Sequence, residues 1–273
     1  MTLSDQLTQV RGFIIDLDGV LYRGNTPVAG ASEFVDALRQ SGTPLVLLTN
    51  NSVRTAARYV DKLARMGICI DADGILTSGQ ATVLYLCQVA PQGATVFLIG
   101  EDGVRTELVS RGFLLRNAPD VDYVVVGFDR AVNYQKLELA TLAIRAGAKF
   151  VGTNPDKTFP SEAGLIPGNG AILAAIEAAT DVAPLVVGKP SPAIFELALE
   201  KLGTKAHETV MIGDRLDTDI IGAHQVGLVT ILVLSGVTSA EQLATASVAP
   251  DRVCDDIAAV HDAWRRARQD AGK

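Results

Sequence analysis

Residues 12–24, GFIIDLDGVLYRG, join an apolar run to two aspartates, Asp16 and Asp18, that are separated by one leucine. A run that is apolar at every position is typical of a strand covered on both faces of a parallel sheet. Two carboxylates at the end of such a strand repel each other, and burial raises the free energy of their charged forms further. The stretch therefore predicts either an ordinary solvated turn or a site that takes a positively charged ligand.

Further apolar runs, rich in valine, isoleucine and leucine, alternate with helical patterns along the rest of the chain. This alternation predicts an α/β fold built on a doubly wound, mostly parallel sheet. The expected helices include residues 31–42, 54–67, 133–147, 191–203 and 258–272. The other expected strands are PLVLLT (44–49), ATVFLIG (94–100), DYVVVGF (122–128), KFVGT (149–153), PLVVG (184–188), TVMIGD (209–214) and VTILVL (229–234).

Polar residues gather at the ends of the early and late strands, whereas the middle of the chain has fewer of them. This distribution predicts one doubly wound core domain, made of residues 1–80 and 184–273, that is interrupted by an inserted α/β module. The module is expected at residues 81–183.

Composition restricts the class of protein. With 273 residues, of which 48% are hydrophobic and 20% charged, the chain is long enough to bury a sizeable core. Its net charge of −7 argues against a nucleic-acid partner, which would need a basic stripe. Three dispersed cysteines predict free thiols in a reducing compartment, and neither a signal peptide nor a membrane-spanning run is evident. We therefore expect a cytoplasmic protein without membrane contact.

Four expected strand ends carry unusual polar groups. In an open parallel sheet, ligands bind beyond the carboxyl ends of the strands. Each group alone is typical of a turn, a helix cap or a solvated lysine, but together and in this order they predict a single site. The groups are Asp16 with Asp18, then Thr49 with Asn50 and Asn51, then Lys189, and last Asp214 with Asp219.

This ordered set resembles the four motifs of the haloacid dehalogenase superfamily. The motifs match Asp16-x-Asp18, Thr49-Asn50, Lys189 and Gly213-Asp214-x-x-x-x-Asp219. The phrases DLDGVLYRG, LTNNS, TNPD, PGNGAI, VGKPSP and GDRLDTDI are similar to the NagD-like phosphatases, the group of para-nitrophenyl, pyridoxal and phosphoglycolate phosphatases. The resemblance implies a Rossmann-like core with a large α/β cap inserted between the second and third motifs.

The resemblance also implies a reaction: hydrolysis of small phosphomonoester metabolites through an aspartyl phosphate. Asp16 would be the nucleophile. Asp18 would protonate the leaving oxygen and later deprotonate the attacking water. Lys189 and Thr49 would stabilise charge on the phosphoryl oxygens, and the amides of Asn50 and Asn51 would help to hold them.

Charge counting predicts a Mg²⁺ cofactor. Asp16, Asp214 and Asp219 carry three negative charges against one positive charge from Lys189, and such a site would repel a phosphate dianion. Hard oxygen ligands suit magnesium better than zinc. Asp16 and Asp214 are expected to bind through their side chains and Asp18 through its backbone carbonyl. Asp219 would either bind the metal directly or orient a water molecule.

The expected insert contains a candidate loop, VGTNPDKTFP (151–160). It places Thr153, Asn154 and Asp156 after a strand, with Phe159 close by in sequence. If the insert is a cap, this loop would contact the leaving group and exclude water, with Asn154 binding substrate. Each single residue fits a plain turn before a helix equally well.

Other functions remain open on the sequence. A phosphotransferase or phosphomutase shares the four motifs, and a non-catalytic phosphate-binding regulator would retain the same polar residues. A receiver-type phosphoacceptor leaves the insert and the Asp214–Asp219 pair unexplained, and a dehalogenase has no need of Asp18. The resemblance further suggests a homodimer formed through the cap. The substrate is left open among pyridoxal phosphate, glycerol phosphate, phosphoglycolate, sugar phosphates and nucleotides.

Overall fold

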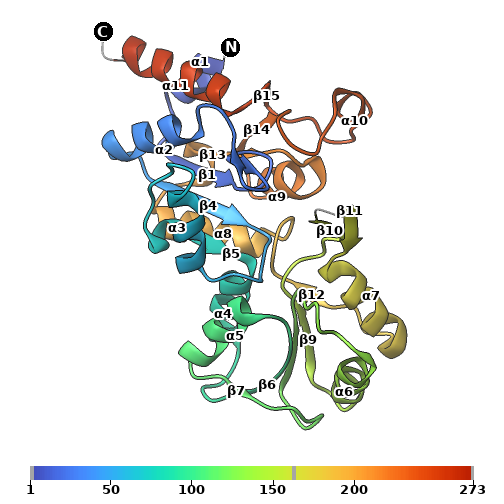
Figure 1. Cartoon of the computed structure of the whole chain (residues 1–273). Coiled ribbons are helices and arrows are strands. Elements are labelled where there is room, and N and C mark those ends of the chain that lie inside the picture. Colours follow the sequence, from blue (N-terminus) through green and yellow to red (C-terminus); the bar gives the residue numbers. More distant parts are fainter. Residues whose placement is uncertain (1–2, 162–163, 272–273) are drawn as a thin grey trace. The chain divides into compact units, whose positions relative to one another are not determined.

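The computed structural model describes residues 3–161 and 164–271, and the chain divides into two compact units. Unit 1 comprises Met1–Thr49, Ala56–Leu76 and Phe195–Lys273. Unit 2 comprises Asn50–Thr55 and Thr77–Ile194. Each unit has its own sheet and its own covering helices, which can be followed by label in Figure 1.

Unit 1 is built on a six-stranded sheet in the order β15-β14-β13-β1-β4-β5. The central strand β1 pairs in parallel with β13 on one side and with β4 on the other. In these pairs Ile15 is level with Ile212, and Asp16 is level with Leu48. The carboxyl ends of the central strands therefore meet at one edge of the sheet. The strands are β1 (Gly12–Asp16), β4 (Leu45–Thr49), β5 (Ile75–Thr77), β13 (Thr209–Gly213), β14 (Val229–Val233) and β15 (Arg252–Cys254).

Alternating side chains of these strands build the core of unit 1. Phe13 and Ile15 join a buried cluster with Phe34 of α2 and Trp264 of α11. A Cβ atom on Gly30 would lie 2.7 Å from the Cβ atom of Ala258, so this glycine lets α2 begin directly against α11. The helices are α1 (Leu3–Leu7), α2 (Ala31–Gln40), α3 (Ala56–Ala64), α8 (Pro192–Leu202), α9 (Ile221–Gln225), α10 (Ala240–Ala244) and α11 (Ile257–Ala271).

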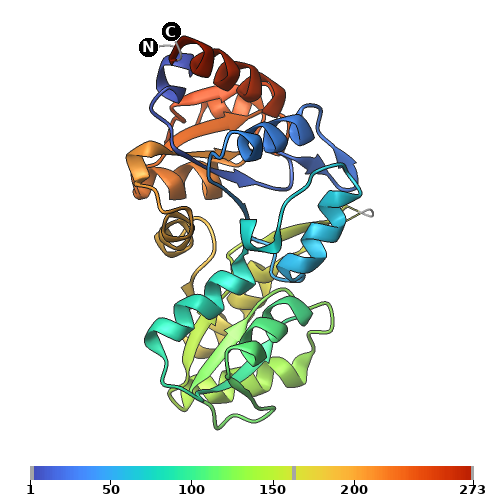
Figure 2. The same ribbon diagram turned by 90° about the vertical axis from the view of Figure 1, so that its left-hand side faces the viewer.

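The first and last helices of the chain lie side by side in unit 1. Both Figure 1 and Figure 2 show α1 next to α11, and the two helices contact each other. A short hairpin of β2 (Tyr22–Arg23) and β3 (Thr26–Pro27) follows β1.

Unit 2 is built on a five-stranded sheet in the order β12-β9-β8-β6-β7, in which each strand runs parallel to its neighbours. Figure 1 shows α4 and α5 on one side of this sheet and α6 and α7 on the other. The strands are β6 (Thr95–Ile99), β7 (Leu114–Leu115), β8 (Tyr123–Val126), β9 (Lys149–Gly152) and β12 (Leu185–Val186). The helices are α4 (Ser78–Val89), α5 (Asp102–Ser110), α6 (Tyr134–Arg145) and α7 (Asn169–Thr180).

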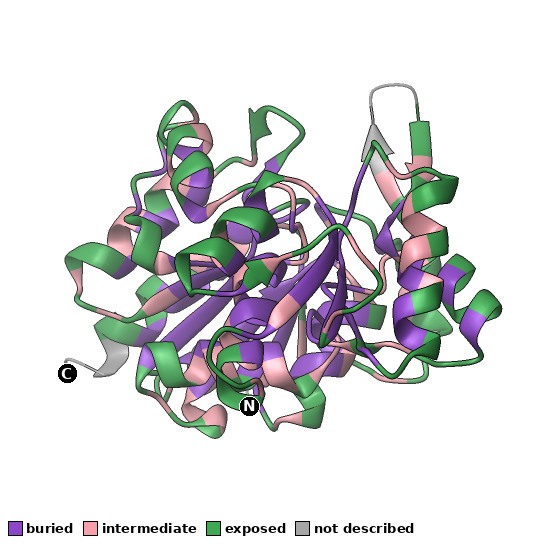
Figure 3. Ribbon diagram, turned by 90° about the horizontal axis from the view of Figure 1, so that it is seen from below, coloured by how far each residue is buried: buried purple, intermediate pink, exposed green. Residues whose placement is uncertain are grey.

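The core of unit 2 follows the same alternation. Phe97 and Ile99 of β6 pack with Val124 and Val126 of β8 against α6 and α7. Figure 3 shows the strands largely in the colour of buried residues and the outer faces of the helices in that of exposed residues. A β-hairpin, β10 (Thr158–Ser161) with β11 (Gly164–Pro167), precedes α7.

The predicted fold class, a doubly wound α/β arrangement with parallel sheets, is confirmed. Every strand expected from an apolar run is present, while three short strands of the two sheets, β5, β7 and β15, lie outside those runs. Among the described residues, no helix combines the length and the apolar character needed to cross a lipid bilayer.

Candidate active site

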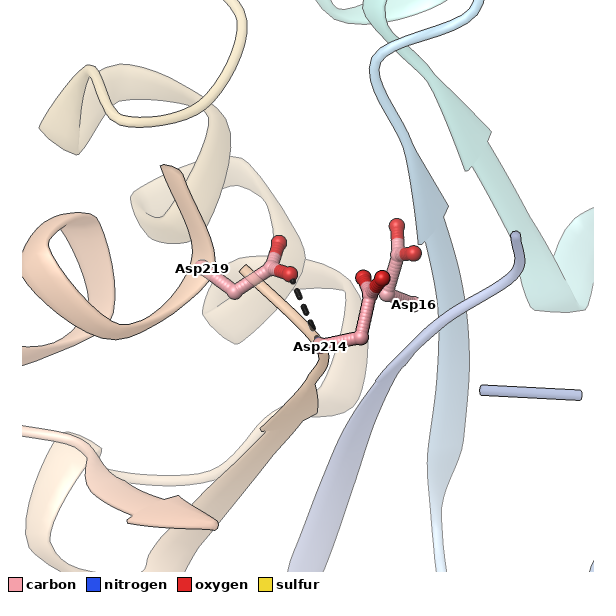
Figure 4. A group of neighbouring side chains, drawn as sticks. All are labelled: Asp16, Asp214 and Asp219. Atoms are coloured by element: carbon pink, nitrogen blue, oxygen red, sulfur yellow. Dashed lines mark hydrogen bonds between the residues drawn. The ribbon is translucent and has the colours of Figure 1, made fainter. Parts of the chain in front are cut away.

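Three aspartates converge at the carboxyl edge of the unit 1 sheet. Asp16 is the last residue of β1, and Asp214 directly follows β13, the strand paired with it. One carboxylate oxygen from each of Asp16, Asp214 and Asp219 lies within 4.8 Å of the other two. All three side chains are buried, with 7%, 1% and 0% exposure. Figure 4 shows their carboxylates turned toward one another.

A wide helical turn places Asp219. Residues Leu216–Ile220 (η3) form one turn of π-helix, in which the amide of Ile220 donates to the carbonyl of Arg215 at 3.2 Å. The Asp219 side chain folds back so that its Oδ2 atom accepts hydrogen bonds from the amides of Asp214 (3.2 Å) and Arg215 (3.1 Å). A Cβ atom on Gly213 would lie 2.3 Å from the Cβ atom of Asp219, so glycine is required there.

Two further glycines make room for Asp214. A Cβ atom on Gly19, whose φ is +86°, would lie 2.3 Å from Oδ2 of Asp214, and one on Gly236 would lie 1.9 Å from the same atom. The amide of Val237 donates to that Oδ2 atom at 2.7 Å. The carboxylate therefore lies in a cradle of backbone that fixes one of its oxygens.

The donor set of this cluster fits a divalent cation. Three buried carboxylates supply hard oxygen atoms, which Mg²⁺ and Ca²⁺ prefer over the nitrogen and sulfur ligands typical of zinc. Buried like charges raise one another's free energy unless a cation compensates them. Asp16, Asp214 and Asp219 are thus the residues that could hold a metal.

Asp18 is held differently from the buried cluster. Its side chain is exposed, and its Oδ2 atom accepts a hydrogen bond from the hydroxyl of Tyr22 at 3.1 Å. Burial raises the pKa of the Tyr22 hydroxyl far above its usual range, and the nearby Asp18 carboxylate raises it further. The amine of Lys62 lies 3.6 Å from the centre of the Tyr22 ring. Tyr22 therefore stays a protonated donor toward Asp18.

The predicted phosphate-binding residues after β4 belong to both units. Thr49 is the buried last residue of β4 in unit 1. Asn50 and Asn51 begin the short segment that is part of unit 2, and Oδ1 of Asn51 accepts the amide of Val53 at 2.9 Å.

A second polar group forms within unit 2 and contains Lys189. The Nδ2 atom of Asn50 donates to Oδ1 of Asp156 (3.1 Å) and to the carbonyl of Lys189 (2.9 Å). Asn154 in turn donates to the carbonyl of Asn50 at 2.8 Å. Lys189 is 2% exposed. The structure therefore brings Asn50, Asn154, Asp156 and Lys189 together, although the first and the last are 139 positions apart in sequence.

Neighbouring residues lock this group in place. The side chain of Asn169 donates to the carbonyls of Asn154 (2.7 Å) and Val126 (3.2 Å), which joins the loop after β9 to the end of β8. A Cβ atom on Gly188 would lie 2.3 Å from the carbonyl oxygen of Thr153 and 2.8 Å from Oδ1 of Asn50. Glycine at this position therefore lets the chain enter the Lys189 turn.

An aromatic pair in unit 2 includes Phe159 of the candidate loop at residues 151–160. Phe159 packs on Phe128, with ring centroids 4.7 Å apart and planes inclined by 31°. The guanidinium of Arg130 lies 5.9 Å from the centre of the Phe128 ring.

Several supporting residues were not predicted from the sequence. Tyr22, the amide of Val237 and Asn169 are the clearest cases. Tyr22 could have been found as a polar aromatic residue four positions after Asp18. Ser235, whose hydroxyl donates to the carbonyl of Gly19 at 2.7 Å, lies in a Ser-Gly pair just after β14, which is a turn signal.

Comparison with protein families places these features in a known group. A family model described as haloacid dehalogenase-like hydrolase matches residues 13–114. A second model, described as HAD-hydrolase-like, matches residues 186–260.

Individual relatives agree. The chain is 42% identical over 244 residues to the acid sugar phosphatase of Staphylococcus aureus (strain USA300), covering 89% of this chain and 94% of that protein. The 4-nitrophenylphosphatase of Thermotoga maritima superposes with a TM-score of 0.90 at 34% identity, covering 94% and 98% of the two chains. NagD from Escherichia coli K-12 gives a TM-score of 0.85 at 36% identity, covering 91% and 97%.

The matches to relatives extend over nearly the whole of this chain and of each relative, and the two family models include the aspartates that gather at the edge of the unit 1 sheet. The chain therefore belongs to the haloacid dehalogenase-like hydrolases, and within them to the NagD-like phosphatases, enzymes that hydrolyse phosphoric monoester bonds.

Proposed function

We propose that this phosphatase is Mg²⁺-dependent and hydrolyses small phosphorylated metabolites through an aspartyl-phosphate intermediate. The observation that carries the proposal is the convergence of three buried carboxylates at the ends of neighbouring strands. Carboxylates buried this closely need compensating positive charge, and a metal with a phosphate ligand provides a reason for the arrangement.

Asp16 and Asp18 both take part in each of the two steps of the reaction. In the first half, a carboxylate oxygen of Asp16 forms a bond to phosphorus while the bond from phosphorus to the ester oxygen breaks. Asp18 gives its proton to that leaving oxygen. In the second half, water attacks phosphorus, Asp18 takes a proton from the water, and the bond to Asp16 breaks, releasing inorganic phosphate. The Tyr22 hydroxyl, at 3.1 Å, supports this role by orienting the Asp18 carboxylate.

The metal-binding role falls to Asp16 and Asp214 through their side chains and to Asp18 through its backbone carbonyl. Oδ2 of Asp219 already accepts hydrogen bonds from two backbone amides. The other oxygen of this carboxylate would therefore bind the metal, either directly or through a water molecule. When bound, Mg²⁺ would offset the carboxylate charges and polarise a phosphoryl oxygen. Three carboxylates and one lysine leave a net charge of −2, which one divalent cation brings to zero.

Phosphate binding is assigned to Thr49, Asn50, Asn51 and Lys189. A buried lysine is a strong donor to a phosphate dianion, and its burial at 2% exposure reduces competition from water. The hydrogen bond from Asn50 to the carbonyl of Lys189 supports an indirect role for Asn50, because it fixes the turn that carries the lysine.

Unit 2 is proposed to act as the cap that selects the leaving group, with Asn154 and the Phe128–Phe159 pair as contacts. Sugar phosphates are the first substrate class to test, because an acid sugar phosphatase is 42% identical to this chain. Action in the cytoplasm, expected from the dispersed cysteines, and dimerisation through the cap, expected from the family resemblance, remain predictions.

The test is phosphate release from a panel of sugar phosphates, pyridoxal phosphate, glycerol phosphate and nucleotides, with Mg²⁺ or with excess EDTA. We expect turnover that requires Mg²⁺ and is abolished by Asp16→Asn. Asp219→Asn should reduce turnover severely, whereas Asp217→Asn, which alters an exposed neighbour in the same turn, should leave it nearly unchanged. Full turnover in EDTA, or an active Asp16→Asn enzyme, would overturn the proposal.

A further inference from the structure

A cavity of about 300 Å³ lies in unit 2, and none of its seven lining residues is one of the residues proposed above for catalysis or phosphate binding. Three of the lining residues are cationic, one is an amide and three are apolar. The seven are Phe97, Leu98, Arg105, Leu115, Arg116, Asn117 and Lys136. This volume is at the small end of the range for ligand pockets, roughly 300–1,000 Å³.

The cavity forms because β7 is short. It pairs only with Thr95 and Val96 of β6, and the next residue, Arg116, donates its amide to the carbonyl of Val96 at 2.9 Å. The chain then turns away, so the rest of the β6 edge, at Phe97 and Leu98, lines the cavity instead of pairing with β7.

The cavity lies at the edge of β6 that faces β7, next to the last residue of that short strand. Arg105 and Lys136 project from the first turns of α5 and α6, the helices that follow β6 and β8.

The charges of the cavity oppose that of the whole chain, which is −7. One cation is anchored, since the amine of Lys136 lies 2.6 Å from Oδ2 of the buried Asp129. Hydrogen bonds from the amide and the hydroxyl of Thr95 lower the pKa of the exposed Asp122 carboxyl, and the nearby Arg116 guanidinium adds a smaller effect in the same direction. Arg105 adds a second guanidinium that is exposed to solvent.

We propose that this cavity is a second ligand site, which takes a small organic polyanion bearing carboxylate or phosphate groups. The two guanidinium groups match the geometry of such groups and can bind them in a bidentate manner. Asn117 adds an amide donor, and the floor of Phe97, Leu98 and Leu115 packs on the carbon skeleton. The inference does not depend on the proposed mechanism of the phosphatase.

The test is isothermal titration calorimetry of the full chain in EDTA, at constant ionic strength, with citrate in one arm and pyrophosphate in the other. EDTA removes metal-dependent anion binding elsewhere, and the two arms distinguish a carboxylate site from a phosphate site. The variants are Arg105→Gln and Arg116→Gln. The matched control is Arg111→Gln, an exposed arginine at the end of α5 that does not line the cavity.

We expect saturable binding of at least one probe. Each cavity variant should weaken it by about tenfold, the loss expected for one charge-assisted hydrogen bond, while Arg111→Gln changes it by less than about twofold. The proposal is overturned if neither probe binds saturably or if Arg116→Gln binds as tightly as the wild type. It is also overturned if Arg111→Gln weakens binding as much as the cavity variants, because the attraction is then a diffuse surface effect.

Discussion

The backbone cradle around Asp214 predicts how the substitution of a single glycine should affect turnover. Gly19 has a φ of +86°, and a Cβ atom there would lie 2.3 Å from Oδ2 of Asp214. Gly19→Ala should therefore displace this carboxylate and reduce turnover on the order of 10²-fold, which is the loss of rate expected from a small displacement of a group in an active site. The measurement is the steady-state hydrolysis of para-nitrophenyl phosphate.

Gly24→Ala is the matched control for this variant. Gly24 has a similar φ of +60°, but a Cβ atom there would meet nothing within 4 Å. Both substitutions incur the backbone penalty of an alanine in this region, about 1 kcal/mol of unfolding free energy. Only Gly19→Ala should lose activity, and equal activity in the two variants would show that the cradle does not position Asp214.

The hydrogen bond from Tyr22 to Asp18 gives a second prediction. Tyr22→Phe keeps the buried ring but removes the hydroxyl that lies 3.1 Å from the Asp18 carboxylate. We expect kcat to fall about tenfold, in line with the loss of one charge-assisted hydrogen bond, while KM stays nearly the same. Tyr134→Phe, which alters a tyrosine that is 82% exposed, is the control. An unchanged kcat in Tyr22→Phe would leave Tyr22 with a packing role only.

Residue types and spacing were sufficient to predict the aspartates but not the groups that hold them. Asp16 and Asp214 stand out because carboxylates at the ends of apolar strands need an explanation, and Asp219 follows Asp214 by five residues. The donors to Asp214 and Asp219 are backbone amides, and any residue except proline supplies one. The amide of Val237, for example, could not be recognised from its side chain.

At the level of elements, the two sheets share one arrangement of hydrogen bonds between an aspartate and a threonine at the start of neighbouring strands. Oδ2 of Asp122, just before β8, accepts the amide and the hydroxyl of Thr95 at the start of β6, both at 2.7 Å. The amide of Asp122 donates back to the hydroxyl of Thr95 at 3.0 Å. Asp251, just before β15, clamps Thr230 of β14 in the same way. Each clamp fixes the register of two neighbouring strands.

The clamp in unit 2 should make stability depend on acid pH. Hydrogen bonds from the Thr95 amide and then its hydroxyl lower the pKa of the Asp122 carboxyl in the folded state. Its stabilising effect is therefore complete above the ordinary pKa of 3.8 and is lost as the pH falls through the lower folded value. Asp122→Asn should thus reduce the free energy of unfolding near neutral pH and lose its effect in strong acid.

Denaturant unfolding of the wild type and the variant across this pH range is the measurement. Asp120→Asn is the control, because Asp120 is exposed two residues away. A destabilisation by Asp122→Asn that stayed constant into strong acid would contradict the role of the charged carboxylate.

The sequence predicted elements well where they are long and apolar. β1, β6, β13 and β14 each have five residues and coincide with apolar runs. β7 has two residues, Leu114–Leu115, and exists only through its pairing with β6. Such a strand has no periodicity of its own, so its tertiary partner, rather than its local sequence, determines it.

The division of the whole molecule depends on contacts between residues that are distant in sequence. The sequence predicts an insert at residues 81–183, and the compact unit comprises Thr77–Ile194 together with Asn50–Thr55. The short segment joins unit 2 through contacts that are distant in sequence, such as the bond from Asn50 to the carbonyl of Lys189. No local sequence pattern predicts such a contact, because Asn50 and Lys189 are 139 positions apart.

Metal binding should stabilise one unit selectively, and the chain contains a natural reporter for it. Its single tryptophan, Trp264, is buried in the core of unit 1, which also holds the aspartate cluster. A ligand that binds only the folded state stabilises it by RT ln(1 + [L]/Kd), about 2.7 kcal/mol at a hundredfold excess over Kd. Mg²⁺ should therefore raise the unfolding temperature followed by Trp264 fluorescence. The shift should disappear in Asp214→Asn, which retains an acceptor for the Val237 amide but loses the charge, and it should persist in Asp217→Asn. An equal shift in Asp214→Asn would place the stabilising ion outside the cluster and remove the physical reason for burying three carboxylates together.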